Sequence, residues 1–279
     1  MQYSVAVVYS ATIGRFEIAS LQVWTLQQMP ASEVLMGTDT RSLEDCRARL
    51  PHFFGDTASL IELTQNICVI RSSEQIVLVD TGEPLRRAGA ILEWGLASIG
   101  IAPEAVDLVF LTHRDSDHVG GTVNLHGEPL YPRATYLISR FEYNEFKAEA
   151  QRADQFRTSI QPLEDRGVLE FFEDGAEIAP GLTTVPTPGH RSGATSLRVE
   201  DGSQAALLLA DTLHLPVQIT HPECSSVWDS DGELAARTRQ RIVQQAESEG
   251  LLLAVPHTPF GGLGRVRLED GRRVWSPIA

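Results

Sequence analysis

The sequence predicts a mixed fold of the α/β or α+β class, in which amphipathic helices cover buried β-sheets. Short, nearly continuous apolar runs recur along the chain, which is typical of strands that are buried on both faces. Longer segments between them carry apolar residues on one helical face, and such mixtures pack as sheets covered by helices. Because the sequence contains no tandem repeat and no Gly/Ser/Pro-rich linker, we expect one domain over residues 1–279, with residues 1–15 as an N-terminal extension.

The expected strands follow this extension. They are identified by β-branched and aromatic residues and by turn residues at their ends. In chain order they cover residues 16–26, 66–71, 75–80, 106–112, 134–139, 168–173, 182–187, 195–200, 204–210 and 251–255. The second and third of these runs are close enough to form a hairpin that turns at residues 72–74.

Three helices are expected between the strands. The first covers residues 84–99, with Pro84 at its start and Gly100 just past its end, as helix ends prefer. The second is charged and covers residues 141–152. The third begins at the Ser-Asp-Gly-Glu sequence of residues 230–233, which resembles a capping box, and ends near residue 249, before Gly250.

The composition excludes several classes of function. The net charge of −14 creates a field that repels phosphate backbones, so we expect no nucleic-acid partner. Lys147 is the only lysine, which excludes a Walker-type phosphate loop. No stretch approaches the ~20 apolar residues of a membrane span, so no membrane partner is expected, and residues 1–14 lack the pattern of a signal peptide.

The cysteines favour a reducing compartment. Cys46, Cys68 and Cys224 are odd in number and none forms a Cys-x-x-Cys pair, so we expect reduced thiols in a cytoplasmic protein. Cys68 lies in an apolar run and is expected to be a core residue. The sequence leaves the roles of Cys224 and His221 open.

Several apolar runs end in a residue that can bind a metal or orient a ligand. These residues are Asp80, His113, His190, Asp211 and His257. In layered α/β folds, functional groups gather in the loops beyond the strand ends. We therefore expect these side chains to converge on one site.

The densest group of potential ligands lies in residues 111–121, Leu-Thr-His-Arg-Asp-Ser-Asp-His-Val-Gly-Gly. In a loop that leaves a strand, residues two apart can face the same way, so His113 and Asp115 can share one metal. Asp117 and His118, on the next turn, can serve a second. Imidazole and carboxylate ligands suit zinc, iron or manganese.

This segment resembles the signature Thr-His-x-His-x-Asp-His-x-Gly-Gly of the metallo-β-lactamase superfamily, with one departure. Four further pieces match the family's other motifs in order: Val79-Asp80-Thr81-Gly82, Thr187-Pro188-Gly189-His190, Leu209-Ala210-Asp211-Thr212 and Val255-Pro256-His257. The resemblance implies a four-layer αββα sandwich of the α+β class, with two sheets face to face and the metals at one edge.

The resemblance also implies a role for each matched residue. One metal would be held by His113, Asp115 and His190, and the other by Asp117, His118 and His257. Asp211 would bridge the two divalent ions, and Asp80 would orient ligands by hydrogen bonds. Asp117 would in addition be catalytic, because it would orient the bridging hydroxide and pass a proton to the leaving group.

The departure is Asp115, which stands where the family usually has His. An additional carboxylate makes the site less positive and favours harder metals, so iron or manganese becomes an alternative to the zinc that the family implies. The same substitution is compatible with a site that has lost one metal. It also keeps a diiron redox protein among the alternatives, together with a non-catalytic metal-binding member of the fold.

The flanks of Asp211 and His257 indicate the substrate class. Residues 212–217 and 257–264 resemble the branch that contains lactonases and methyl-parathion-type organophosphate hydrolases. We therefore expect a metal-dependent hydrolase that uses a metal-bridging hydroxide to cleave a small, fairly apolar lactone, ester or phosphotriester. His214, Phe260 and Trp228 are candidates for the substrate pocket, and a homodimer is left open.

Overall fold

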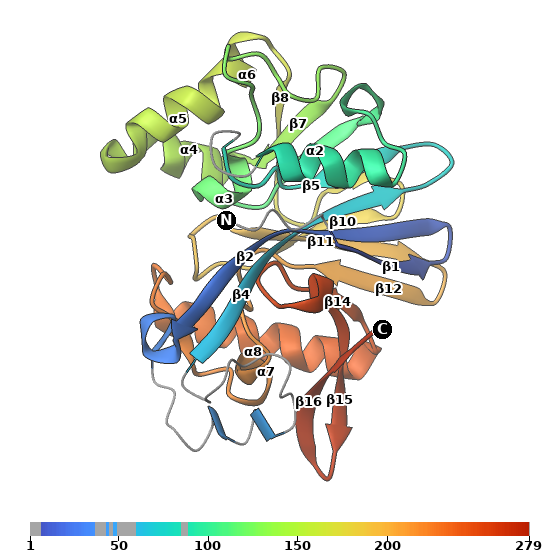
Figure 1. Cartoon of the computed structure of the whole chain (residues 1–279), viewed down its shortest axis with the longest axis vertical. Helices are drawn as coiled ribbons and strands as arrows, with labels where there is room; N and C mark the ends of the chain where they lie inside the picture. Colours follow the sequence, from blue (N-terminus) through green and yellow to red (C-terminus); the bar gives the residue numbers. More distant parts are fainter. Residues whose placement is uncertain (1–6, 37–42, 45–46, 49–59, 85–88, 279) are drawn as a thin grey trace.

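The structure, a computed structural model, describes residues 7–36, 43–44, 47–48, 60–84 and 89–278. Within these ranges, most strands belong to two large sheets that lie face to face (Figure 1). Cys46, residues 1–6 of the expected N-terminal extension and residues 85–88 of the first expected helix lie outside the described residues.

The first sheet is built from the N-terminal half of the chain. Its strands are β1 (Val7–Ile13), β2 (Phe16–Pro30), β4 (Leu60–Arg71), β5 (Ile76–Val79), β6 (Leu108–Leu111), β7 (Thr135–Ser139) and β8 (Leu169–Phe172). They follow one another across the sheet in chain order. The strands from β1 to β5 are antiparallel, and those from β5 to β8 are parallel.

The second sheet is built from the C-terminal half. Its strands are β9 (Glu177–Ala179), β10 (Leu182–Pro186), β11 (Thr195–Asp201), β12 (Gln204–Leu208), β14 (Leu252–Ala254), β15 (Leu263–Glu269) and β16 (Arg272–Pro277). Only the β12–β14 pair is parallel among them. A small third sheet pairs β3 (Leu35–Met36) with β13 (Ser225–Ser226).

Helices cover the outer faces of both sheets, which completes four layers. The first sheet is covered by α2 (Gly89–Ser98), α4 (Arg140–Ala148), α5 (Ala153–Ser159) and α6 (Gln161–Asp165), and the second by α8 (Gly232–Glu249) (Figure 1). Val77 and Phe110 of the first sheet pack against Leu197 and Leu208 of the second in the central core. The predicted αββα sandwich is confirmed.

Short helical segments connect these elements. They are α3 (Ser116–Val119), α7 (Val217–Thr220) and the 3-10 turns η1 (Ala31–Glu33), η3 (Pro103–Ala105), η4 (Ala150–Arg152) and η5 (Phe260–Gly262). Among the described residues, no helix is long and apolar enough to cross a membrane.

The structure differs from the sequence prediction at several elements. Residues 7–13 of the expected extension form β1, the edge of the first sheet. The helix expected over residues 141–152 breaks at Glu149, whose extended backbone separates α4 from η4. The N-cap of α8 is Asp231 and not Ser230, because the Asp231 carboxylate accepts from the backbone N–H of Leu234.

Candidate metal centre

The expected ligands come together at one edge of the sandwich, from loops that follow strands of both sheets. His113 follows β6 of the first sheet, and α3 then carries Asp117 and His118. On the other side, His190, Asp211 and His257 follow β10, β12 and β14. The two groups meet because the strand ends of the facing sheets lie at the same edge.

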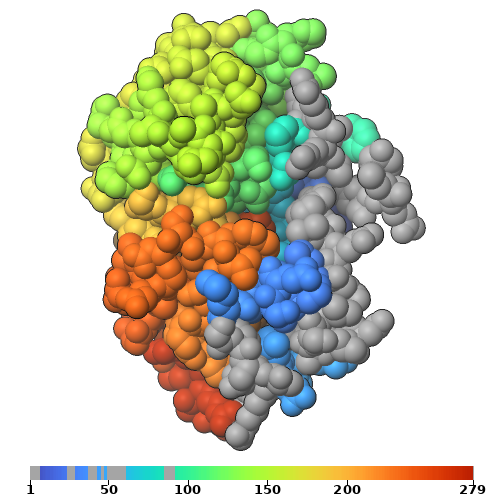
Figure 2. Space-filling view, turned by 90° about the vertical axis from the view of Figure 1, so that its left-hand side faces the viewer, coloured from blue at the N-terminus to red at the C-terminus, as the bar shows by residue number. Residues whose placement is uncertain are grey.

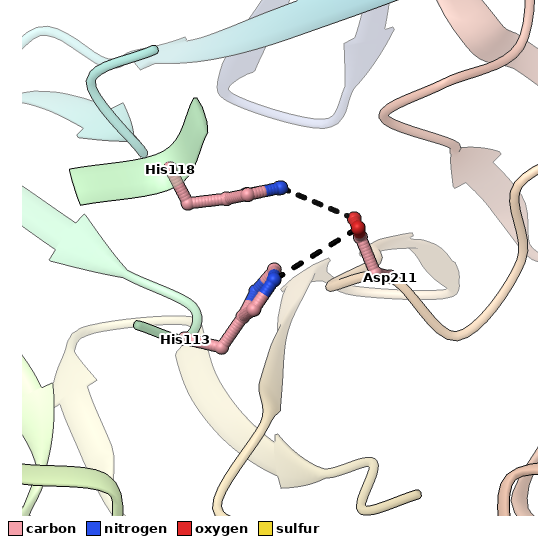
Figure 3. Close-up of side chains that lie close together, drawn as sticks. All are labelled: His113, His118 and Asp211. Atoms are coloured by element: carbon pink, nitrogen blue, oxygen red, sulfur yellow. Dashed lines mark ion pairs between the residues drawn. The ribbon is translucent and has the colours of Figure 1, made fainter. Parts of the chain in front are cut away.

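Asp211 lies at the centre of this group. Its Oδ2 is 3.1 Å from His257 Nε2, 3.5 Å from His190 Nε2 and 3.8 Å from His113 Nε2. Its Oδ1 is 3.3 Å from His118 Nε2. Figure 3 shows His113 and His118 pointing from one side toward this carboxylate. A carboxylate with imidazoles facing each oxygen is placed to bridge two cations.

Several buried donor atoms of the centre fit a metal. His113 Nε2, His118 Nε2 and Asp211 Oδ1 have no hydrogen-bond partner among the described residues. Buried polar atoms are rarely left unsatisfied, and neutral imidazole nitrogens facing carboxylate oxygens are common zinc ligands. Two of the compact donor groups match the expected division of ligands: His113, Asp115 and His190 in one, and Asp117, His118 and His257 in the other.

Hydrogen bonds fix which ring nitrogen of each histidine faces the centre. The Nδ1 of His118 donates to Asp80 at 2.7 Å, and that of His257 donates to the Thr64 carbonyl at 2.9 Å. The Nδ1 of His190 faces Asp229 Oδ1 at 3.1 Å. Each Nε2 therefore points inward, and the partner of each Nδ1 holds the ring in place.

Asp80 contacts residues of the 112–118 loop through its carboxylate. Its carboxylate accepts from the backbone N–H and hydroxyl of Thr112, both at 2.8 Å, as well as from His118. Asp80 itself has φ 65°, a left-handed conformation that Asp tolerates better than most residues. Glycines allow the close packing around this loop, since a Cβ at Gly121 would lie 2.2 Å from the Thr81 carbonyl oxygen.

Asp115 has surroundings that the sequence did not indicate. Its Oδ1 accepts from Arg191 Nε at 2.7 Å and lies 3.0 Å from Arg152 Nη1. Its Oδ2 accepts from Arg191 Nη2 at 2.6 Å and lies 3.1 Å from His190 Nε2. Arg152 belongs to η4 on the first sheet's side, and Arg191 to the loop after β10. Figure 2 shows how the α4–α6 segment, in yellow-green, adjoins the amber and orange segments of the other side.

The charges of the centre shift the acidity of its groups. Burial alone would raise the pKa of Asp117, but the charge and hydrogen bond of His118 lower it to about 2. Burial alone would lower the pKa of His190, but its hydrogen bonds to Asp115 and Asp229 raise it to about 9. Burial lowers the pKa of His214, which keeps that ring neutral.

A pocket opens onto the centre. Its lining residues are Leu63, Glu83, Asp115, Asp117, His190, Asp211, His214, Trp228 and His257. Of the expected pocket residues, the structure places His214 and the half-exposed Trp228 in this lining. Phe260 is 40% exposed and is not among the residues that line it.

Sequence reasoning missed Asp229, Arg152 and Arg191. Arg191 directly follows His190, yet an arginine in a loop has no pattern that marks it as a partner of a distant carboxylate. Asp229 lies 39 positions after its histidine partner, and only the fold brings the two together.

Comparisons with known proteins agree with this architecture. The family model of the metallo-beta-lactamase superfamily matches residues 60–257. Metallo-beta-lactamase domain-containing protein 1 of Mus musculus is 52% identical over 172 residues, which are 61% of this chain and 56% of that protein. An N-acyl homoserine lactonase of Bacillus cereus is 28% identical over 114 residues, 41% of each chain. The chain thus spans about half the length of the curated relatives it matches.

Solved structures share the whole fold. The hydrolase AbOPH of the beta lactamase superfamily superposes with a TM-score of 0.88 at 23% identity, and the match covers 99% of each chain. The dizinc quorum-quenching lactonase AidC superposes with a TM-score of 0.81 at 21% identity, covering 99% of this chain and 98% of that one. With the family model matching most of the chain and the ligand motifs converging at one edge of an αββα sandwich, the chain belongs to the metallo-beta-lactamase superfamily.

Proposed function

We propose that the protein is a metal-dependent hydrolase that opens a small, fairly apolar lactone. Aryl esters and phosphotriesters are related substrates that the same centre can accept. The observation that carries the proposal is the convergence of histidine Nε2 atoms and the carboxylates of Asp117 and Asp211 beside a pocket at the sheet edge. The similarity to an N-acyl homoserine lactonase of Bacillus cereus supports a lactone as the substrate class.

The centre has donors for two divalent ions. His118, His257 and Asp117 would hold one ion, His113 and His190 would hold the other, and Asp211 would bridge them. A further donor for the second ion is available from Asp115 or from His214, each of which forms a compact group with His190. Two such ions, when bound, polarise a substrate oxygen and make hydroxide available as a nucleophile near neutral pH.

Asp117 is the residue that we propose to handle protons. It lines the pocket, and its low pKa keeps the carboxylate ionised at neutral pH. From this position it would orient the attacking water, take its proton as the water attacks and pass that proton to the leaving oxygen. The Gln65 side chain donates to the backbone carbonyl of Asp117, which holds this segment of α3 against β4.

The pocket wall fits a neutral acyl compound. Leu63 and the half-exposed ring of Trp228 supply apolar surface, while Glu83 and the carboxylates of the centre disfavour polyanionic substrates. A small-molecule substrate, a single catalytic domain and a cytoplasmic location with reduced, buried Cys68 and Cys224 belong to the same proposal. Whether the protein is a homodimer can be measured directly by light scattering.

The proposal is tested with metal-loaded protein and a panel of acyl-homoserine lactones, simple lactones, aryl esters and aryl phosphotriesters. Asp117→Asn should retain the fold and lower kcat by about 100-fold or more, because it removes the proton acceptor. His221→Ala is the matched control, since His221 pairs with Glu223 outside the pocket and its loss should leave kcat unchanged. Reduction of oxygen or nitric oxide with an electron donor, without turnover of any ester or lactone, would favour the diiron alternative. Metal binding without either activity would favour the non-catalytic one.

A further inference from the structure

His214 is a buried histidine whose ring nitrogens make no hydrogen bond among the described residues. Its side chain is 1% exposed. The backbone that carries this ring is nevertheless held in place. The backbone N–H of His214 donates to Gln218 Oε1 at 2.8 Å, and its carbonyl accepts from the hydroxyl of Thr258 at 3.0 Å. A buried imidazole without a hydrogen-bond partner among the described residues therefore lines the pocket.

The ring of His214 lies among the metal donors. Its Nε2 is 3.5 Å from Asp211 Oδ2, the same oxygen that faces His190 and His257. The ring stacks on that of His257, with centroids 5.4 Å apart and planes 13° apart. Its donor atom forms a compact group with those of His190 and Asp211. An imidazole placed in this way can bind the ion that His190 binds.

The carboxylate oxygens of Asp115, by contrast, already accept hydrogen bonds from arginine side chains. Arg191 donates to both oxygens of this carboxylate, and Arg152 makes an additional ion pair with Oδ1. Arg191 cannot swing away, because its Nη1 donates to the carbonyls of His190 and Trp228, at 2.7 and 2.8 Å, and to the hydroxyl of Ser230 at 3.0 Å. A carboxylate whose oxygens are used by a locked guanidinium is a weaker metal donor than a free imidazole.

Charge leads to the same assignment. If Asp115 were a ligand, three carboxylates would face the two ions. If His214 takes its place, only Asp117 and Asp211 do, while the negative charge of Asp115 is offset by Arg152 and Arg191. The donors to the ion that His190 binds would then be the imidazoles of His113, His190 and His214 and the carboxylate of Asp211. Such a set suits zinc.

We propose that His214 is a metal ligand that, with His113, His190 and Asp211, completes the donor set for which Asp115 was the sequence-based candidate. Asp115 is then a positioning residue, which holds the Arg191 guanidinium that donates to the backbone carbonyl of His190. This inference rests on the proposed use of metal by the protein, and it goes beyond that proposal by assigning a ligand and by favouring zinc over iron or manganese.

The test is cobalt(II) titration of the metal-free full chain, followed by the visible absorption of the bound ion and by elemental analysis. His214→Ala should bind one equivalent tightly and lose more than about 100-fold in affinity for the second, with a changed cobalt spectrum. Asp115→Asn should still bind two equivalents, with a loss of about 10–100-fold, as expected for a residue that positions a ligand. His221→Ala, outside the pocket, should match the wild-type protein in both respects.

His214→Cys provides a second readout that does not depend on loss of binding. A thiolate at this position should produce a sulfur-to-cobalt charge-transfer band in the near ultraviolet, because the band requires direct ligation. Two tight equivalents in His214→Ala together with no charge-transfer band in His214→Cys would overturn the inference. So would loss of one equivalent in Asp115→Asn alone, which would make Asp115 the ligand. In either case lactone hydrolysis by the wild-type protein would still stand, whereas a wild-type chain that binds no metal would remove the proposed function as well.

Discussion

At the scale of single residues, the histidines that we propose as metal ligands are oriented by carboxylates and carbonyls that bond their Nδ1 atoms. Asp80 is the most connected of these, because it joins Thr112 and His118 in one network. Asp80→Asn keeps the shape of the side chain and tolerates the positive φ, but it removes the charge that holds His118. We expect a loss of about 10–100-fold in metal affinity with little change in fold, measured by competition with a chelating dye.

The matched control for this variant is Asp107→Asn. Asp107 also accepts a backbone hydrogen bond within the first sheet, from Ile76 at 2.8 Å. It lies where β5 and β6 begin, however, whereas Asp80 lies where β5 ends. Equal losses of metal affinity in the two variants would mean that Asp80 acts through general stability and not through His118.

Protonation of the ligands predicts how metal uptake depends on pH. In the metal-free protein the pKa of His190 is about 9, so this ring carries a proton at pH 7 that an incoming ion must displace. Affinity should therefore rise as the pH increases from 7 to about 9, with proton release that calorimetry in buffers of different ionisation enthalpy can count. A pH-independent affinity over this range would contradict the prediction.

The same group links pH to the stability of the metal-free fold. Because the folded-state pKa of His190 lies above its unfolded value of about 6.5, its protonation stabilises the fold fully below pH 6.5. That contribution is lost as the pH rises through about 9. The contribution of His190 should accordingly make the free energy of unfolding of the metal-free protein in urea lower at pH 9 than at pH 6.5. His190→Gln should reduce this difference.

At the scale of elements, the sequence patterns identified the strands that precede the proposed ligands and Asp80. β5, β6, β12 and β14 are largely buried apolar runs followed by a polar residue, and β10 is rich in β-branched residues. The search for continuous apolar runs missed strands that bury only one face or only part of their length. In β15 the residues from Arg267 onward are exposed, and β1 exposes most of its residues at the sheet edge, so neither forms a continuous apolar run. The break between α4 and η4 is likewise invisible in the sequence, since the local residues are acceptable in a helix.

The loop between β10 and β11 contains the glycine on which the position of His190 depends. Gly189 has φ 134°, and a Cβ there would lie 2.3 Å from the backbone Cα of Ala235 in α8. Gly189→Ala should therefore destabilise the fold by about 1–3 kcal/mol, and it should weaken metal binding because His190 is the next residue. Urea unfolding and metal titration measure the two effects.

Gly202→Ala separates strain from steric contact in this experiment. Gly202 also has a positive φ, of 61°, but nothing lies within 4 Å of an added Cβ. This variant should show the cost of the backbone conformation alone, about 1 kcal/mol, with unchanged metal affinity. If it behaved like Gly189→Ala, the contact with α8 would not be the cause.

At the scale of the whole molecule, the candidate metal centre lies where the two sheets meet. The 113–118 loop extends from the first sheet, while His190, Asp211 and His257 extend from the second. Direct hydrogen bonds also cross here, since Asn66 of β4 donates to the carbonyls of Val255 and Thr258. The ordered motifs were sufficient to predict this convergence, whereas Arg152 and Asp229 could not be predicted, because their contacts depend on how the helical layers and loops pack around the centre.

A centre that spans both sheets should make stability depend on metal. Ions that bind only the folded chain stabilise it by RT ln(1 + [L]/Kd), about 2.7 kcal/mol for free metal at 100 times Kd. For a domain of this size, such a gain corresponds to a rise in Tm of about 5–11 °C, measured by thermal unfolding with zinc and with a chelator. The double variant His118→Gln with His257→Gln removes ligands from both sheets and should lose most of the rise, whereas His221→Ala should keep it. Because linkage reports preferential binding to the folded state, an unchanged Tm in the wild-type protein would show that the ion does not bind the folded chain in preference to the unfolded one, which would contradict the proposed centre.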